Sequence, residues 1–356
     1  MLLPPDLVTP VLVVDQARLE RNLRDMAASA AARGIRLRPH AKTHKTAQIA
    51  RLQLDLGAIG LTVATIGEAE RFADAGVADL FIAYPIWPSP ARVNRLRALA
   101  DRVRLRVAAE SPAAAQRLAP LSHGTSPPEI LVEIDSGHHR TGVPPDRAGE
   151  VGLAAARAGL PVAGVFTFPG HGYAPGAREQ AAAQEAAALA AAAAALHDAG
   201  CERSGGSTPT AQLTADPPPT ELRPGVYVFN DAQQLELGVC RGDQIALAAA
   251  ATVVSHQAPG RFVLDCGSKV IGADRQPWST GFGRVLDRPG ARIVALSEHH
   301  ATITLPPGMA LPDLGQIVAV VPNHVCNAVN LADELLVIRD GEVFDAWRVM
   351  ARGANS

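Results

Sequence analysis

The sequence is poor in cysteine and carries no excess of either charge. Its 4 cysteines are far apart and form no CxxC pair, which favours reduced thiols in a cytoplasmic protein over a disulfide framework. Lysine and arginine number 33 against 35 acidic residues, so the surplus of cations that binds nucleic acid or an anionic membrane surface is missing. The N-terminus has no basic stretch ahead of an apolar run, and we expect no signal peptide.

Long apolar runs are also missing. The most apolar segment, residues 181–196, is mostly alanine and contains Gln184 and Glu185, which is typical of a helix in water rather than of a membrane span. The chain is nevertheless 47% hydrophobic over 356 residues. That is enough to bury one large core, or one large and one small domain.

Short β-branched runs alternate with longer helical segments up to about residue 235. The expected strands are Ile35–Arg38, Leu61–Thr65, Leu80–Tyr84, Arg104–Ala108, Ile130–Asp135, Val162–Phe168, the weak Cys201–Ser204, and Val226–Phe229. The expected helices are Gln16–Arg33, Lys45–Leu56, Gly67–Ala75, Pro90–Ala100, Asp146–Ala158 and Arg178–Ala199. This alternation predicts a parallel (β/α)8 barrel.

After about residue 240 the pattern changes to short strands punctuated by glycine and proline, and we expect no helix of any length. The expected strands are Thr252–His256, Arg261–Asp265, Arg292–Leu296, Ala301–Leu305, Gln316–Val321, Glu334–Arg339 and Val343–Val349, with Val11–Asp15 a candidate to join them. The sequence therefore predicts an all-β domain. We expect the barrel to span residues 16–238 and the β domain to span residues 1–15 and 239–356.

The segment RPHAKTHK, residues 38–45, follows the first expected strand of the barrel. Catalytic groups of such barrels come from the carboxyl ends of the strands. Lys42 would lose its proton easily if it were desolvated and surrounded by cations, and Arg38, His40, His44 and Lys45 are candidates for that role. Taken alone, however, the octapeptide fits a solvated or anion-binding basic patch better.

Four other polar segments lie at or near the ends of expected barrel strands, and one of them contains the tight turn Pro224-Gly225. They are EIDSGHHRTGV (residues 133–143), FPGHGYAPG (168–176), SGGSTPT (204–210) and ELRPGVYVF (221–229). The first gathers Asp135, His138, His139 and Arg140, and the second adds His171 and Tyr173. Backbone N–H groups and hydroxyls of the third, with those of Gly225 and Val226, could hold a phosphate without a basic residue. Each motif alone is weak, but the strand ends bring them to one edge.

The segment PNHVCNAVN, residues 322–330, lies in the expected β domain. His324 and Cys326 are two positions apart, so on an extended strand they would project to one face. An imidazole and a thiolate on one face suit zinc, and two ligands would leave open positions for catalysis. A buried cysteine beside a histidine satisfied by other partners is the commoner explanation of an isolated HxC.

Together these segments resemble the fold-type III pyridoxal phosphate enzymes, the alanine racemase superfamily, and within it the D-threonine aldolase and D-serine dehydratase group. The resemblance implies an alanine racemase-type N-terminal barrel and a C-terminal β domain, with pyridoxal 5'-phosphate held as a Schiff base on Lys42. It implies that Arg140 bonds the phenolic oxygen of the cofactor and that Arg223 reaches its ring nitrogen. The other cofactor-binding residues it implies are Tyr173, Ser207, Thr208, Gly225 and Val226.

The same resemblance implies that His324 and Cys326 bind a divalent metal, zinc or manganese, and that Lys42 and His324 are catalytic. It implies a homodimeric lyase that cleaves small β-hydroxy-D-amino acids, as D-threonine aldolase does, to glycine and an aldehyde. Aldolases of the group often have aspartate where Cys326 stands, whereas the zinc-dependent D-serine dehydratases have cysteine. Dehydration of D-serine or D-3-hydroxyaspartate to a keto acid and ammonia is therefore the alternative.

Three rival functions stay open at this point. A metal-free amino-acid racemase needs a second acid or base, usually a tyrosine of the β domain, but Tyr84, Tyr173 and Tyr227 all fall in the expected barrel. A non-catalytic cofactor carrier of this fold usually consists of the barrel alone. The third rival is a metal-binding β module joined to an unrelated barrel.

Overall fold

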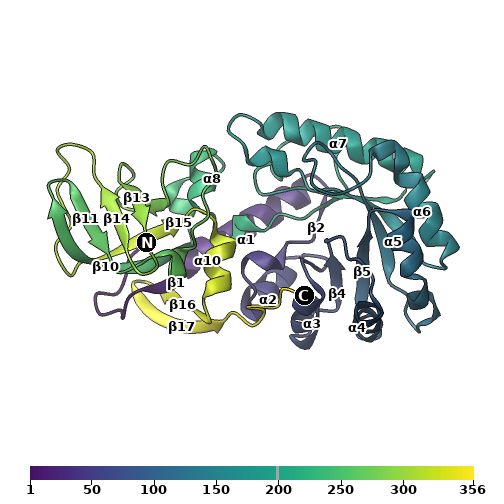
Figure 1. Ribbon diagram of the computed structural model, residues 1–356, viewed down its shortest axis with the longest axis horizontal. Coiled ribbons are helices and arrows are strands. Elements are labelled where there is room, and N and C mark those ends of the chain that lie inside the picture. The colour runs from purple at the N-terminus through teal and green to yellow at the C-terminus, as the bar shows by residue number, and fades with distance from the viewer. Residues whose placement is uncertain (198–199) are drawn as a thin grey trace. The chain divides into compact units, whose positions relative to one another are not determined.

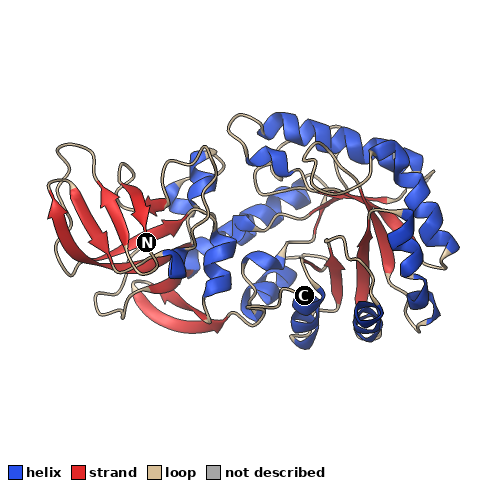
Figure 2. Ribbon diagram, in the orientation of Figure 1, coloured by secondary structure: helices blue, strands red, loops and turns tan. Residues whose placement is uncertain are grey.

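The computed structural model describes residues 1–197 and 200–356, and the chain divides into two compact units (Figure 1). The first, which we call the sheet unit, contains Met1–Arg24, Thr43–Gln48 and Val226–Arg352. The second, the barrel unit, contains Asp25–Lys42, Ile49–Gly225 and Gly353–Ser356. The domain boundaries expected from the sequence stay a prediction. Figure 2 shows that helices surround the strands of the barrel unit, whereas strands dominate the sheet unit.

The barrel unit contains an eight-stranded parallel sheet in the order β2-β9-β8-β7-β6-β5-β4-β3. These strands are β2 (Arg36–Leu37), β3 (Leu61–Val63), β4 (Asp79–Ile82), β5 (Arg104–Ala109), β6 (Glu129–Glu133), β7 (Val162–Phe166), β8 (Glu202–Gly205) and β9 (Glu221–Leu222). A parallel bridge between His40 and Thr62 joins the segment after β2 to β3, at the other edge of the sheet. The predicted (β/α)8 fold with a mainly β C-terminal part is confirmed.

Helices alternate with these strands, and their ends follow local sequence signals. They are α1 (Gln16–Ala32), α2 (Ala47–Asp55), α3 (Ile66–Asp74), α4 (Pro90–Ala100), α5 (Pro112–Arg117), α6 (Ala148–Arg157) and α7 (Arg178–Ala195). Ser89 caps α4 by accepting the Arg92 N–H, and Pro90 occupies the first turn. Helix α7 was expected to reach Ala199, but residues 198–199 lie outside the described residues.

Short 3-10 turns complete the chain. They are η1 (Ala41–Thr43), η2 (Ala119–His123), η3 (Pro145–Arg147), η4 (Gly170–Tyr173), η5 (Val226–Val228) and η6 (Gly242–Gln244).

The eighth barrel strand was expected at Val226–Phe229, and this prediction is wrong. The strand is β9, upstream of Pro224-Gly225, and the Val226 segment forms η5. The carbonyl of Val226 accepts the N–H groups of Phe229 and Asn230, so this apolar run is coiled although it is buried. Apolar β-branched residues indicate burial here, but not an extended backbone.

The sheet unit holds a nine-stranded mixed sheet with the order β13-β14-β11-β10-β1-β16-β17, and β15 pairs with both β10 and β12. Its strands are β1 (Val11–Asp15), β10 (Leu247–Ala258), β11 (Arg261–Leu264), β12 (Gly283–Val285), β13 (Arg292–Leu296), β14 (Ala301–Thr304), β15 (Ile317–Pro322), β16 (Glu334–Arg339) and β17 (Glu342–Arg348). Strand β1 does join this sheet, antiparallel to β10 and parallel to β16.

The sheet unit also contains short helices that the sequence did not predict. They are α8 (Ala232–Glu236), α9 (Ser268–Ile271) and α10 (Val325–Leu331). In the part of the chain that the structure describes, no helix combines the length and apolar character needed to cross a bilayer.

Candidate active site

Lys42 lies in η1, directly after the carboxyl end of β2, with its side chain half-buried. The Pro224 carbonyl accepts the backbone N–H of His40, and His40 Nδ1 accepts the backbone N–H of Lys42 at 3.5 Å. The Lys42 Nζ atom is 5.9 Å from the ring centroid of Phe168, which follows β7. The ammonium therefore faces the aromatic side chain of a second strand end.

Phe168 is the centre around which several predicted residues gather. The guanidinium carbon of Arg140 is 5.1 Å from its ring centroid, and the Tyr173 ring is 6.1 Å away. The His138 ring meets it edge-to-face at 5.7 Å. Two cations over one aromatic ring are favourable cation–π contacts. The structure thus brings Lys42, Arg140 and Tyr173 together, and it adds Phe168, which was only one letter of a motif in the sequence.

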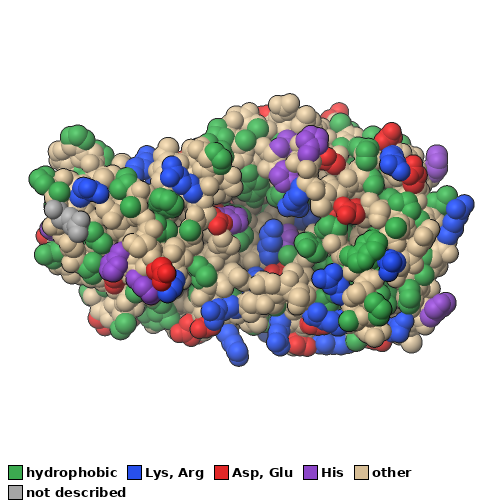
Figure 3. Space-filling view, in the orientation of Figure 1, with side chains coloured by type: hydrophobic (Ala, Val, Ile, Leu, Met, Phe, Trp, Pro, Cys, Tyr) green, Lys and Arg blue, Asp and Glu red, His purple; other side chains and the backbone are tan. Residues whose placement is uncertain are grey.

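A histidine cluster belongs to the same strand ends, and Figure 3 shows histidine side chains gathered on the barrel unit. His139 Nδ1 is 2.6 Å from Asp135 Oδ2, and His171 Nε2 is 3.0 Å from Gln184. Burial lowers the pKa of His138, and the charges of Arg140 and His171 lower it further. A Cβ atom on Gly170 would lie 2.6 Å from the His138 ring, so only glycine permits this approach. Because burial and the neighbouring charges lower its pKa, His138 is neutral near pH 7.

The expected cationic surroundings of Lys42 are not formed by Arg38 and Lys45. Arg38 is fully buried and pairs with Glu221 at 2.8 Å and Asp79 at 2.5 Å. Lys45 Nζ donates to Asn330 Oδ1 at 2.7 Å. Both side chains turn to partners far away in the sequence, which a local motif cannot indicate.

The SGGSTPT segment forms a buried turn after β8, with Ser207 and Thr208 only 2% and 4% exposed. Gly206 has a φ of +83°, and a Cβ there would lie 2.7 Å from Leu222 Cδ2, so the turn requires glycine. Unlike the expectation, the Gly206 N–H points to Glu185 Oε1 at 2.5 Å and the Ser207 N–H to Thr210 Oγ1 at 3.0 Å.

The predicted cofactor site also includes Arg223 and the backbone N–H groups that follow it. Within the described part of the chain, the N–H groups of Gly225 and Val226 donate no hydrogen bond. Arg223 is buried at the end of β9, where its Nε donates to Ser204 Oγ at 2.8 Å and its Nη2 donates to the Thr167 carbonyl. The Gly225 N–H group and the Arg223 cation, both in the barrel unit, suit a phosphorylated heteroaromatic ring, so these residues fit pyridoxal phosphate.

Glu185 on α7 is a buried acid that touches this turn. Burial raises the pKa of its carboxyl from 4.5 to about 7, against the Gly206 N–H and the charge of Arg223, which lower it. The folded protein therefore keeps a proton that the unfolded chain has released. The stability that the protonated Glu185 carboxyl contributes is fully present below about pH 4.5 and is lost as the pH rises through about 7.

We expect Glu185→Gln to remove this part of the pH dependence, because an amide does not ionise. The variant should match wild type near pH 5 and should be roughly 3 kcal/mol more stable near pH 8, the free energy of a pKa shift of this size. Urea unfolding at both pH values measures the difference. Glu150→Gln, which changes an exposed acid paired with Arg147, is the control and should follow wild type. If the Glu185→Gln protein and wild type lost the same stability between about pH 5 and about pH 8, the expectation would be contradicted.

His324 and Cys326 do not lie on a strand, so the expected geometry is wrong. Strand β15 ends at Pro322, His324 has an extended backbone at the N-cap position, and Cys326 lies in the first turn of α10. The two side chains nevertheless interact, because Cys326 raises the pKa of His324. Cys326 Sγ also lies 3.4 Å from Thr43 Oγ1, the hydroxyl of the residue after Lys42 in the chain.

Asp231 is a partner of His324 that sequence reasoning missed. Its carboxylate is fully buried and accepts the N–H groups of Gln234 and Val325, which lie in the first turns of α8 and α10. Asp231 Oδ2 lies 3.6 Å from His324 Nδ1. Burial of His324 lowers its pKa, but Cys326 and Asp231 outweigh this and hold the pKa well above its usual value. A carboxylate behind a histidine is a common way to orient a metal ligand.

The residues of the sheet unit fit a divalent ion that keeps open positions. Imidazole and thiolate are both zinc ligands, and His324 and Cys326 lie side by side. Among the described residues no group of three or more His, Cys, Asp or Glu side chains could hold a metal. Two protein ligands would leave open positions for water and substrate, as in catalytic zinc sites.

Comparison with known proteins gives two family matches. The family described as alanine racemase, N-terminal domain, matches residues 14–233, and the putative serine dehydratase domain matches residues 246–338. D-threo-3-hydroxyaspartate dehydratase of Delftia sp. (strain HT23) is 36% identical over 346 residues, covering 89% of this chain and 90% of that enzyme. D-threonine aldolase of Arthrobacter sp is 35% identical over 364 residues, covering 97% and 93%.

Solved structures agree with these sequence matches. D-threonine aldolase from Filomicrobium marinum superposes with a TM-score of 0.88 at 33% identity, covering 99% of this chain and 98% of that one. Two others, with TM-scores of 0.88 and 0.87, are alanine mutants of D-threo-3-hydroxyaspartate dehydratase. One replaces a histidine and the other, in the metal-free form, replaces a cysteine two positions later.

Proposed function

We propose that this chain, which belongs to the alanine racemase N-terminal domain family and to its group of D-threonine aldolases and D-threo-3-hydroxyaspartate dehydratases, is a metal-dependent lyase of β-hydroxy-D-amino acids. It is homologous over its full length to pyridoxal phosphate-dependent lyases. The reaction we propose is retro-aldol cleavage to glycine and an aldehyde. We further propose that the enzyme is a homodimer.

The observation that carries the proposal is the group of Lys42, Arg140 and Tyr173 around Phe168. The chain has only three lysines. Lys269 is exposed and paired with Glu298, and Lys45 is buried and bonded to Asn330. This leaves Lys42 as the lysine at the barrel strand ends that can hold an aldehyde cofactor covalently.

Each proposed residue has a chemical task. Bound pyridoxal phosphate supplies an electron sink for the bond broken at the substrate Cα. Lys42 would hold the cofactor's aldehyde carbon, and Arg140 would donate to the phenolic oxygen. Arg223 would keep the ring nitrogen unprotonated, which weakens the sink. The proposed cradle for the cofactor is Tyr173, Ser207, Thr208, Gly225 and Val226.

A weak sink makes help at the substrate's β-oxygen more important. His324 and Cys326 would hold zinc or manganese, which as a Lewis acid polarises that oxygen and is worth several kcal/mol of charge stabilisation. The carboxylate of Asp231 would keep the His324 ring in the orientation for binding. A thiolate ligand favours zinc over harder ions.

Dehydration is the second candidate function, and one observation favours it. The histidine and cysteine mutated in the related dehydratase are two positions apart, as His324 and Cys326 are. In that reaction the Lys42 amine would take the α-proton and the β-hydroxyl would leave as water, and hydrolysis of the resulting enamine by water would give a keto acid and ammonia. A metal-free racemase is the weaker rival, although Tyr227 belongs to the sheet unit rather than to the barrel unit.

A product assay tests the proposal and predicts its stereochemistry. D-threonine, D-serine and D-3-hydroxyaspartate are each incubated with the enzyme, with and without added Zn²⁺ or Mn²⁺, and the products are identified by mass spectrometry. We expect glycine and an aldehyde from D-threonine and no product from L-threonine, because the barrel would leave only one face of the bound cofactor open to substrate. Keto acid and ammonia would instead select the dehydratase, and comparable turnover of L-threonine would contradict both.

A further inference from the structure

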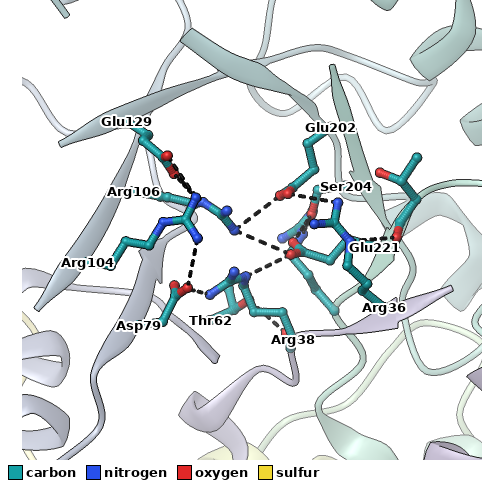
Figure 4. A network of polar contacts seen from close by, with 12 residues as sticks. Arg36, Arg38, Thr62, Asp79, Arg104, Arg106, Glu129, Glu202, Ser204 and Glu221 are labelled. Carbon is teal, nitrogen blue, oxygen red and sulfur yellow. Dashed lines mark hydrogen bonds and ion pairs between the residues drawn. The ribbon is translucent and has the colours of Figure 1, made fainter. Parts of the chain in front are cut away.

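A continuous buried chain of polar groups begins at Arg223 and runs through the interior of the barrel unit. Figure 4 shows its members Ser204, Glu221 and Arg38. Arg223 Nε donates to Ser204 Oγ at 2.8 Å, and the Ser204 hydroxyl donates to Glu221 Oε1 at 2.6 Å. Arg38 Nε then donates to Glu221 Oε2 at 2.8 Å. Ser204, Glu221 and Arg38 are all fully buried. The interior of such a barrel is normally filled by apolar side chains, so the presence of these buried polar groups calls for an explanation.

The charge of Glu221 determines the direction of these hydrogen bonds. Burial raises the pKa of its carboxyl, but Arg38, the Ser204 hydroxyl and Arg106 outweigh burial and hold it below the usual value. An ionised carboxylate can only accept hydrogen bonds, so the single proton of Ser204 points to Glu221. The Ser204 oxygen therefore presents a lone pair to Arg223.

Two of the guanidinium nitrogen atoms of Arg223, Nε and Nη2, donate to protein acceptors, and Nη1 is left for a ligand. Ser204 takes its Nε and the Thr167 carbonyl takes its Nη2. The guanidinium carbon also lies 5.6 Å from the ring centroid of Phe81 and 5.1 Å from that of Phe166, and these cation–π contacts stabilise its position further. No described residue accepts a hydrogen bond from Arg223 Nη1.

We propose that Ser204 and Glu221 are positioning residues that hold the Arg223 guanidinium charged and oriented toward the ring nitrogen of the cofactor. This inference rests on the proposed function, because it assigns Arg223 to that nitrogen. A buried guanidinium is costly without a counter-charge. Glu221 supplies the counter-charge through the Ser204 hydroxyl, and Arg38 keeps Glu221 ionised. The two residues act through Arg223.

Removing the Ser204 hydroxyl should change cofactor binding and not merely stability. In the Ser204→Ala holoenzyme Arg223 Nε loses its acceptor, and we expect the dissociation constant of pyridoxal phosphate to rise about tenfold, since hydrogen bonds to charged groups are among the stronger ones. A looser guanidinium also opposes protonation of the ring nitrogen less. The pH at which the visible band of the bound cofactor titrates should therefore move upward.

Two further variants separate positioning from folding. Ser204→Thr keeps the hydroxyl and should restore both the dissociation constant and the pH titration of the band. Thr62→Val is the matched control, because Thr62 Oγ1 donates to the Arg38 carbonyl at 2.9 Å in the same buried interior but does not touch Arg223. It should lower the free energy of unfolding and leave the cofactor spectrum unchanged. Glu221→Gln should resemble Ser204→Ala.

The outcomes also separate this inference from the proposed function. If wild type binds the cofactor on Lys42 but Ser204→Ala has the same affinity and pH titration as Thr62→Val, the positioning role is wrong and the proposed function stands. If wild type binds no pyridoxal phosphate at all, the proposed function itself is wrong. A rise in the dissociation constant that Ser204→Thr reverses supports the inference.

Discussion

The Lys42→Ala protein is expected to lose all measurable turnover together with the visible band of covalently bound cofactor. Only an amine can form the covalent bond to the aldehyde of pyridoxal phosphate, and Lys42 is the amine near the Phe168 ring, which Arg140 also contacts. Absorbance of the purified protein and a product assay with D-threonine measure the two losses. Borohydride reduction of wild type should fix the cofactor on the peptide that contains Lys42.

Lys45→Ala is a matched control for this experiment, because the two lysines are close in sequence but have different surroundings. Lys45 donates to Asn330 and is 4% exposed, so its loss should lower stability and leave the covalently bound cofactor in place. A cofactor label on Lys45 instead of Lys42 would mean that Lys45 holds the cofactor and that the proposed site is wrongly placed in the sequence. A fully active Lys42→Ala enzyme would end the assignment of this cofactor site.

Removal of the metal is expected to cut turnover by about 100-fold or more while the cofactor colour remains. Polarisation of the substrate's β-oxygen is worth several kcal/mol, and neither Lys42 nor an arginine can replace it. Exhaustive chelation, followed by elemental analysis and a product assay, measures the effect. Added zinc or manganese should restore activity. Cys326→Ala should behave as the chelated enzyme does.

The other cysteines and the choice of replacement sharpen this test. Cys326→Asp should keep partial activity and prefer Mn²⁺, because a carboxylate suits harder ions than a thiolate does. Cys266→Ala is the control, since Cys266 is fully buried and burial raises the pKa of its thiol to about 12. Its replacement should lower stability without changing metal dependence. Full activity of a metal-free wild type would leave metal-independent chemistry, with racemisation the first reaction to test.

Agreement between sequence and structure is best where the signal is local and repeated. Alternating β-branched runs and helical segments predicted the barrel, and even the weak strand before SGGSTPT is present as β8. Motifs that follow strands were expected at one edge, and Lys42, Arg140 and Tyr173 do gather around Phe168. This works because parallel strands leave their carboxyl ends together whatever the details of packing.

Agreement is poorer where apolar residues allow more than one backbone conformation. Val226–Phe229 and the HVC segment both read as strands, but η5 and α10 stand there. The Asp231 carboxylate accepts the N–H group of Val325 and so supports the start of α10, although it is distant in the sequence. The helix and strand propensities of neighbouring residues cannot reveal a contact with a residue that is distant in the sequence.

The amino-acid sequence by itself determined the class of fold and the group of enzymes that the chain resembles, and it indicated that Lys42 follows the first strand of the barrel. Only the tertiary structure decided what each polar side chain meets. It turned Arg38 away from Lys42 toward Glu221, joined Ser204 to Arg223, and set Asp231 beside His324. The physical reason is that a buried polar group must find a partner wherever folding brings one, and those partners come from distant parts of the chain.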